Sequence, residues 1–160
     1  MDKSLAVMCD MVKRTRDILF DFTESLPPEI YTFEHPDFAY GSLRNIQAHV
    51  AGCYSFWLAE MALKLESPPK NFELLPNAPA MRAAFLGVDT LVLQALETFQ
   101  NLDAPLELTL PEGNPMMVSQ RWLILHPITH EFHHKGQLLA LARVLGHPLP
   151  EDIFADLVTP

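Results

Sequence analysis

Four of the seven histidines in this 160-residue chain lie within nine consecutive positions: His126, His130, His133 and His134. On an α-helix, the spacing of His126, His130 and His134 places the three side chains on one face, with neighbouring Cβ atoms roughly 5–6 Å apart. Two imidazoles so placed reach a single metal ion at the ~2.0–2.1 Å of a zinc–nitrogen bond. The segment therefore predicts a metal site.

The members of this histidine column are not equivalent. His133 lies about 100° around the helix from His134, so we expect it to be exposed or to contact a ligand side chain without binding the metal itself. His126 precedes Pro127, which cannot donate a helical hydrogen bond, and a kink or a helix start is expected there. His126 is therefore the weakest member of the column, and His130 and His134 are the stronger candidates.

His49 is the best candidate for a third ligand, since a metal usually takes at least three ligands from the protein. It lies among apolar residues, so its side chain is expected to face the interior, where an imidazole needs a partner. Alone it would be a core histidine bonded to a neighbour, but the histidine-rich segment reverses that preference. Cys53, one turn later, is either an extra soft ligand or, by preference, a small buried hydrophobe. A three-histidine site leaves a coordination position open, as in catalytic centres, and suits zinc, nickel, iron or copper.

A second motif uses the same residues. His130, Glu131 and His134 match H-E-x-x-H, in which two histidines bind zinc and the glutamate is the general base of a peptidase. The longer form of that motif has glycine where this chain has Gln137 and histidine where it has Ala140. Glutamate at 131 is also common on a partly exposed helix face, and no sheet is evident that would bind a peptide. A zinc hydrolase is therefore the less favoured alternative.

Four amphipathic segments must position these side chains. Apolar residues recur at helical spacing over residues 4–24, 42–65, 79–100 and 119–145. Ser42 and Ser119 are the expected caps of the second and fourth segments, and Gly146 is expected to end the last one. This plan is that of an all-α four-helix bundle, in which metal sites form between facing helices.

Proline-rich breaks separate the four segments. A long crossover loop is expected over residues 66–80, which hold four prolines. Alternating apolar residues over 106–118 predict a short hairpin or an extended loop between the third and fourth helices. The tail is expected to fold into a short turn through Ile153, Phe154 and Leu157.

The composition predicts one domain over residues 1–160, since 49% apolar residues suffice for a core without disulfides or a structural metal. The formal charge is −9 and the basic residues are scattered, which speaks against nucleic-acid binding. Two cysteines give no disulfide framework. The chain lacks a signal-peptide pattern and an apolar run of the ~20 residues that span a membrane, so a cytoplasmic, soluble protein is expected.

The order and spacing of the histidines resemble the DinB-like family of DNA-damage-inducible proteins over nearly the whole chain. The shared features are a histidine in the middle of the second helix, the pattern H-x3-H-x3-H-[RK]-G-Q on the last long helix, and an ending in Leu-Gly-His-Pro. The resemblance implies an up-down-down-up four-helix bundle that holds a divalent metal through His49, His130 and His134. His126 matches a recurrent position that is not a ligand.

The resemblance also implies a function. Where chemistry is known among such relatives, it is the transfer of low-molecular-weight thiols to electrophiles or thiol-assisted isomerisation, and several members form homodimers. The favoured hypothesis is a metal-dependent thiol transferase, or a related small-molecule enzyme, acting on a thiol and an electrophile with zinc, nickel or iron. The alternative is a non-enzymatic metal-binding module of the stress response.

Further expectations concern the residues next to the candidate ligands. His133 or Glu131 is a candidate for moving a proton. Lys135 replaces a frequent arginine, which keeps the charge but not the bidentate geometry; little is lost if this position forms a salt bridge within the bundle or a dimer. Gly136 costs about 1 kcal/mol relative to alanine in a helix, which close helix packing would explain. Gln137 is expected to orient a ligand histidine through its second nitrogen.

Overall fold

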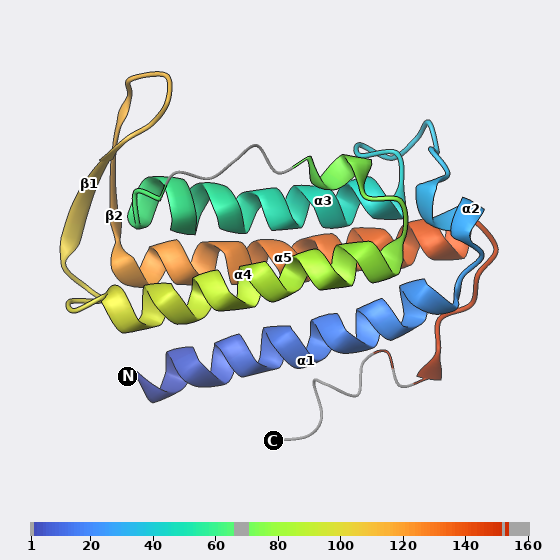
Figure 1. Cartoon of the computed structure of the whole chain (residues 1–160), viewed down its shortest axis with the longest axis horizontal. Helices are drawn as coiled ribbons and strands as arrows, with labels where there is room; N and C mark the ends of the chain where they lie inside the picture. Colours follow the sequence, from blue (N-terminus) through green and yellow to red (C-terminus); the bar gives the residue numbers. More distant parts are fainter. Residues whose placement is uncertain (1, 66–70, 152, 154–160) are drawn as a thin grey trace.

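The computed structural model describes residues 2–65, 71–151 and 153, and most of them are helical (Figure 1). Helix α3 continues directly into the π-helix η1, and together they form the second long helical segment. The elements in chain order are α1 (Lys3–Ser25), α2 (Pro28–Thr32), α3 (Leu43–Tyr54), η1 (Ser55–Ala62), η2 (Phe72–Leu74), α4 (Ala78–Thr98), β1 (Pro105–Thr109), β2 (Pro115–Ser119) and α5 (Gln120–Val144).

The long helical segments lie along one common axis (Figure 1). α1 and α5 run one way along it, and α3 and α4 run the other way. α1 contacts α4 and α5, and α3 contacts the same two helices, so α1 and α3 lie diagonally across from each other. The prediction of a mainly helical chain is confirmed, and the histidine-rich helix α5 lies directly against α3.

Side-chain caps set the starts of the two helices that carry the histidines. Ser42 Oγ accepts a hydrogen bond from the N–H of Asn45, and Ser119 Oγ accepts one from the N–H of Trp122, both at 3.1 Å. Each bond satisfies a first-turn N–H that has no partner inside the helix. At the other end of α5, Gly146 has a φ of +87°, a left-handed conformation that glycine adopts without strain. Both caps and the helix end lie where the sequence predicted them.

Pro127 lies inside α5 and does not begin it, so of the two alternatives, a kink or a helix start, the helix start is wrong. Proline removes one helical hydrogen bond, but Ile124 and Ile128 on either side of it are fully buried. Their packing holds the helix together across the missing bond, because most helical stability in proteins comes from tertiary packing. His126 therefore belongs to the same helix as the other histidines of the column.

β1 and β2 form an antiparallel hairpin between α4 and α5. Leu108 pairs with Met116 in this ladder, and Gly113 occupies the turn with a φ of +85°. Leu108 is 3% exposed and anchors the hairpin on the helical core. The sequence left a hairpin and an extended loop open, and the structure has the hairpin, which delivers the chain directly to the first turn of α5.

The two remaining connections are described in part. Residues 66–70 of the expected crossover loop lie outside the described residues, whereas Phe72 in η2 packs into the core. In the tail, Ile153 is buried, and Phe154 and Leu157 of the expected turn lie outside the described residues.

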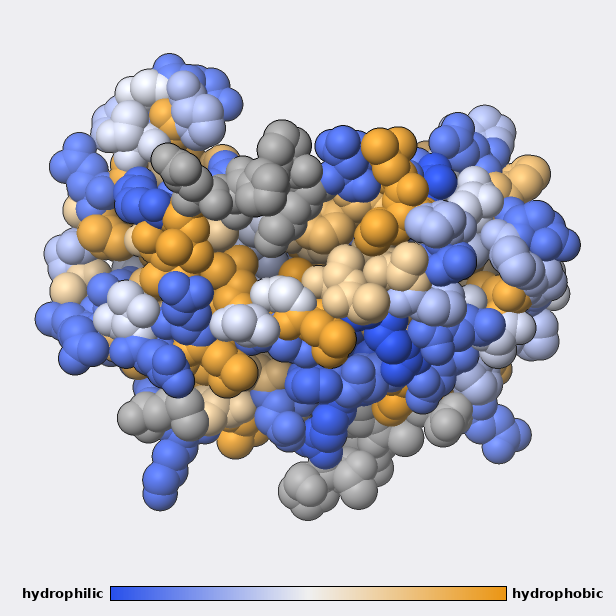
Figure 2. Space-filling model, viewed as in Figure 1, coloured by the Kyte–Doolittle hydropathy of each residue, from blue (hydrophilic) through white to orange (hydrophobic). Residues whose placement is uncertain are grey.

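Apolar side chains of the four long segments fill the interior. The largest fully buried ones on those segments include Leu5, Phe20, Ile46, Tyr54, Met81, Leu123 and Leu138. Some apolar surface also faces outward on the side where α4 lies nearest the viewer (Figure 2). Within the described ranges, no helix has the length and apolar character needed to cross a membrane.

Candidate metal centre

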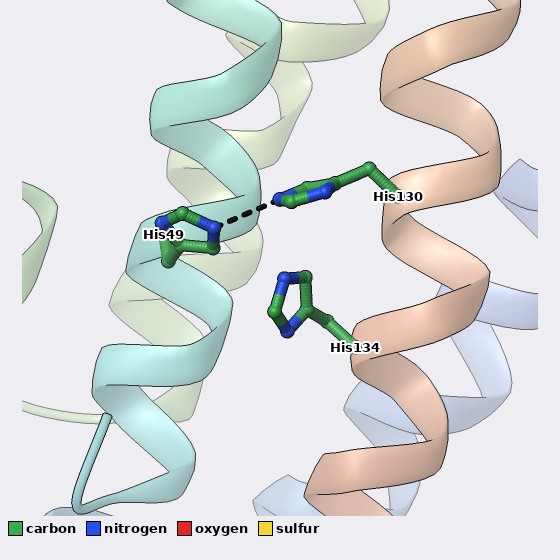
Figure 3. Close-up of side chains that lie close together, drawn as sticks. All are labelled: His49, His130 and His134. Atoms are coloured by element: carbon green, nitrogen blue, oxygen red, sulfur yellow. Dashed lines mark hydrogen bonds between the residues drawn. The ribbon is translucent and has the colours of Figure 1, made fainter. Parts of the chain in front are cut away.

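Three imidazoles meet between α3 and α5 (Figure 3). His49 projects from α3, and His130 and His134 project from consecutive turns of α5. One nitrogen from each ring lies within 4.8 Å of the other two. A metal ion that binds such nitrogens at the ~2.0–2.1 Å of a zinc–nitrogen bond would draw them together by side-chain rotation. The structure thus brings together the three residues that the sequence nominated, as a group that could hold a metal ion.

Two of these rings are hydrogen-bonded to each other. His49 Nε2 and His130 Nε2 are 2.8 Å apart (Figure 3), so one ring carries a hydrogen on Nε2 and donates it to the other. The ring centroid of His49 is 4.8 Å from that of His130 and 4.8 Å from that of His134. A cation bound between the three rings would replace the hydrogen shared by His49 and His130.

Tyr40 is a member of the site that the sequence did not reveal. Its hydroxyl lies 3.0 Å from His49 Nε2, and its ring stacks on His49 with centroids 4.3 Å apart. Gly41, with a φ of +73°, turns the chain between Tyr40 and the cap of α3. An aromatic residue before a glycine and a helix cap was the only sequence signal, and it does not say which side chain the ring covers.

Gln137 fixes the orientation of His134. Its Oε1 accepts a hydrogen bond from His134 Nδ1–H at 2.7 Å, and its Nε2 donates to His133 Nε2 at 3.1 Å. With the hydrogen on Nδ1, His134 keeps a lone pair on Nε2 for a metal. The expectation that Gln137 holds a histidine through its second nitrogen is confirmed. His133 is exposed, as expected, and lies behind this glutamine.

The surroundings keep these imidazoles neutral. Burial, together with the neighbouring histidines, lowers the pKa of His130 to about 4. Burial also lowers the pKa of His49, and His134 adds to that shift. For His134, burial lowers the pKa, although the hydrogen bond that His134 donates to Gln137 acts the other way. The neutral imidazole is the form that binds metals, so protons compete weakly for this group at neutral pH.

A cavity of about 340 Å³ opens beside the histidines. It is lined by His49, Gly52, Cys53, Phe56, Trp57, His126 and His130. Apolar and aromatic walls with a few converging polar groups are typical of sites for small molecules. An ion held by the three histidines would therefore be reachable by a small ligand from this cavity.

His126 and Cys53 stand apart from the three-histidine group. The ring of His126 stacks on Trp122, with centroids 4.5 Å apart. Cys53 is only partly buried and lines the cavity, so the preferred expectation of a buried hydrophobe is wrong. The helical turn from His49 to Cys53 places the thiol next to His126 instead of next to His134, and Cys53, His126 and His130 form a second close group.

Glu131 points into the protein interior. It is 4% exposed, and its carboxylate accepts hydrogen bonds from Arg16 at 2.7 and 2.9 Å and from the hydroxyl of Tyr54 at 2.8 Å. The expectation of a partly exposed glutamate is wrong, because the buried guanidinium compensates the charge. Since both oxygens are engaged, Glu131 does not offer the free general base of the H-E-x-x-H motif, and the hydrolase interpretation loses its main support.

The charged cluster around Glu131 connects four helices. Arg16 of α1 also donates to Asp89 of α4, while Glu131 and its partner tyrosine belong to α5 and α3. Burial acts against the charge on Arg16, but Glu131 raises its pKa above the usual value. This cluster was not predicted from the sequence. Arg16 falls at helical spacing between the buried residues Val12 and Phe20, and this spacing could have indicated that Arg16 is buried too.

Lys135 and Gly136 follow His134, and the structure shows contacts that account for the first residue but not for the second. Lys135 is buried, and it donates to Thr15 Oγ1 at 3.2 Å and to the carbonyl of Ile153 at 3.1 Å. It thereby ties α5 to α1 and to the C-terminal segment. A Cβ on Gly136 would meet no described atom within 4 Å, so the expected close packing is wrong, and nothing in the structure explains this glycine.

The comparison with known proteins agrees with this architecture and with these histidines. The DinB family model matches residues 1–157, which include every helix described above and all three members of the histidine group. No curated protein matches the sequence at a significant level. The resemblance seen in the histidine spacing is confirmed, and the chain belongs to the DinB family.

Proposed function

We propose that the protein is a metal-dependent thiol transferase, or a related small-molecule enzyme, with His49, His130 and His134 as the ligands of a divalent ion. The observation that carries the proposal is the convergence of three neutral imidazoles from two helices beside a cavity of about 340 Å³. An all-imidazole group suits zinc, nickel or iron. The directions and contacts of the four long helical segments support the four-helix bundle implied by the family resemblance.

A divalent ion in this group would act as a Lewis acid and deprotonate a coordinated thiol. The protein's residues prepare the site for that step. Gln137 holds His134 with its Nε2 lone pair free, and the Tyr40 hydroxyl lies at the metal-facing nitrogen of His49, where it is placed to donate to a bound ligand. A thiol activated in this way would supply the sulfur that replaces a leaving group on an electrophilic carbon. The leaving group would depart with its electron pair, and the thiol proton would pass to water.

The cavity indicates the kind of electrophile. Phe56 and Trp57 supply apolar walls, and His126 lies across from them on α5. A small electrophile with an apolar or aromatic body fits this lining better than an extended chain. The net charge of −9 speaks against a nucleic-acid partner.

Turnover by the loaded protein tests the proposal. Metal-free chain is reloaded with zinc, nickel or iron and incubated with pairs of low-molecular-weight thiols and electrophiles, while the loss of free thiol is followed. At least one pair should react faster with loaded than with metal-free protein, and His49→Ala should remove the difference. His147→Ala, which changes a histidine outside the cluster, should leave it intact. If no pair shows a metal-dependent rate, a non-enzymatic metal-binding module becomes the better account.

We further propose that the chain forms a homodimer through α1 and α4. Val7, Leu86 and Leu93 of these helices are 57–65% exposed, and a groove of about 270 Å³ runs between the two helices. Light scattering after gel filtration should give a dimer that Leu93→Glu converts to monomer. Leu74→Glu, an exposed leucine of η2, should leave the dimer unchanged. A monomeric unmodified protein would contradict this part of the proposal.

A further inference from the structure

A second group of donor atoms lies one helical turn along from the three-histidine group. The Sγ of Cys53, a nitrogen of His126 and a nitrogen of His130 all lie within 4.8 Å of one another. Cys53 follows His49 by one turn of α3, and His126 precedes His130 by one turn of α5. The two groups therefore lie side by side between the same helices and share His130.

Two tryptophans hold His126 in place. Its ring stacks on Trp122 at a centroid distance of 4.5 Å and an interplanar angle of 16°. Trp57 meets the same ring edge-on at 5.3 Å. An imidazole clamped in this way loses little rotational freedom when it binds an ion. Because His126 and Cys53 both line the cavity of about 340 Å³, an ion and a small ligand can reach them.

The two added donors differ in their protonation. Burial lowers the pKa of His126, so its ring offers a lone pair at pH 7. Burial, together with the Glu131 carboxylate, raises the pKa of the Cys53 thiol to about 12, so the thiol is protonated and unreactive on its own. A coordinated cation displaces that proton to solvent and leaves a metal-bound thiolate.

We propose that Cys53, His126 and His130 form a second metal site that takes soft or borderline ions such as copper(I), zinc or cadmium. One thiolate and two imidazoles suit such ions better than the harder divalent cations. Since His130 supplies a nitrogen to both groups, occupancy of one site influences the other. The inference does not depend on thiol transfer, because it concerns ligands outside the three-histidine group.

Cobalt(II) titration of the full chain tests this site, because only a cobalt–thiolate bond gives an intense sulfur-to-metal charge-transfer band in the near ultraviolet. The unmodified protein should show the band at saturation. Cys53→Ser and His126→Ala should each abolish it, the latter with the thiol still present. Cys9→Ser is the matched control, since Cys9 is also a partly buried free cysteine but belongs to no donor group among the described residues. The band should persist in Cys9→Ser and in His49→Ala.

The proposal would be overturned by the absence of the band in the unmodified chain, by its survival in Cys53→Ser or in His126→Ala, or by its loss in Cys9→Ser. Loss in His49→Ala would also overturn it, because Cys53 would then be an extra ligand of the first ion. Far-ultraviolet circular dichroism of each variant shows that a lost band does not reflect a lost fold.

Discussion

Two polar clusters occupy neighbouring faces of α5, and they are built in opposite ways. Glu131 is buried, and every donor that satisfies its carboxylate comes from the protein. His130 and His134, on either side of it in sequence, direct ring nitrogens toward each other and toward His49. A buried cluster whose members satisfy one another's hydrogen bonds stabilises the fold, whereas three imidazoles that converge from two helices form a group that could hold a cation. Adjacent residues of α5 thus belong to two clusters of different kinds.

The largest effect is expected from breaking the buried cluster. Glu131→Gln removes the buried carboxylate that neutralises the Arg16 guanidinium and leaves it only the partly exposed Asp89, which should lower the free energy of unfolding by about 3–5 kcal/mol. Urea denaturation of the metal-free protein measures this change. Asp103→Asn is the control, because it breaks an ion pair with Arg121 at the protein surface, and exposed pairs contribute little. Equal effects of the two substitutions would mean that the buried cluster stabilises the fold no more than a surface ion pair does.

The next effect concerns the support of the histidines. Gln137→Ala removes the partner of His134 Nδ1, and loss of such outer hydrogen bonds lowers metal affinity roughly 10–100-fold. Competition with a chromophoric chelator measures it, in a Cys53→Ser background in which the sulfur-containing group is absent. His133→Ala removes only the outer neighbour of the glutamine and should change the affinity far less. An unchanged affinity in Gln137→Ala would show that His134 needs no such support.

Acid should weaken the metal-free fold through the histidine cluster. The folded-state pKa of His130 is about 4, below the ordinary 6.5 of the unfolded chain. The unfolded state therefore binds more protons between these values, and stability falls as the pH is lowered from about 6.5 to about 4. The contribution of this residue is complete above pH 6.5. Unfolding free energies measured across this range should depend less on pH in His130→Ala, and parallel curves would contradict the depressed pKa.

The smallest effect is expected at Tyr40. Tyr40→Phe keeps the ring that stacks on His49 and removes only the hydroxyl near Nε2. The loss of one such hydrogen bond is worth about 1 kcal/mol, so metal affinity should change by less than roughly tenfold. Tyr31→Phe offers the contrast, since its hydroxyl bonds to Gln47 inside the protein and its loss should reduce stability without affecting the metal. A large loss of metal in Tyr40→Phe would make the tyrosine a ligand.

The histidine cluster could be predicted because its signal is local. His130 and His134 share a helix face by spacing alone, and His49 was marked by its apolar neighbours. The caps at Ser42 and Ser119 were predictable for the same reason, since each depends on residues within one turn. Helical periodicity therefore predicted both the helices and the three histidines that meet between two of them.

The buried ion pair and the tyrosine were not predictable in the same way. Arg16 and Glu131 are 115 positions apart, and a charged residue on an amphipathic helix is ordinarily exposed. Only the packing of α1 against α5 shows that each charge has its partner. Tyr40 lies in a loop whose path depends on a left-handed glycine. Local patterns reveal which residues share a face, and tertiary contacts decide which of those faces are buried.

His49 of α3 and the two histidines of α5 are proposed to hold one ion between them. This is tested by elemental analysis of untagged Cys53→Ser protein beside Cys53→Ser/His49→Ala, both purified without chelator and then reloaded with zinc, nickel or iron. Near-stoichiometric metal is expected in the first protein and its loss in the second. Metal retained after the loss of His49 would place the site on α5 alone, and failure of the first protein to take up any of the three metals would contradict the claim outright.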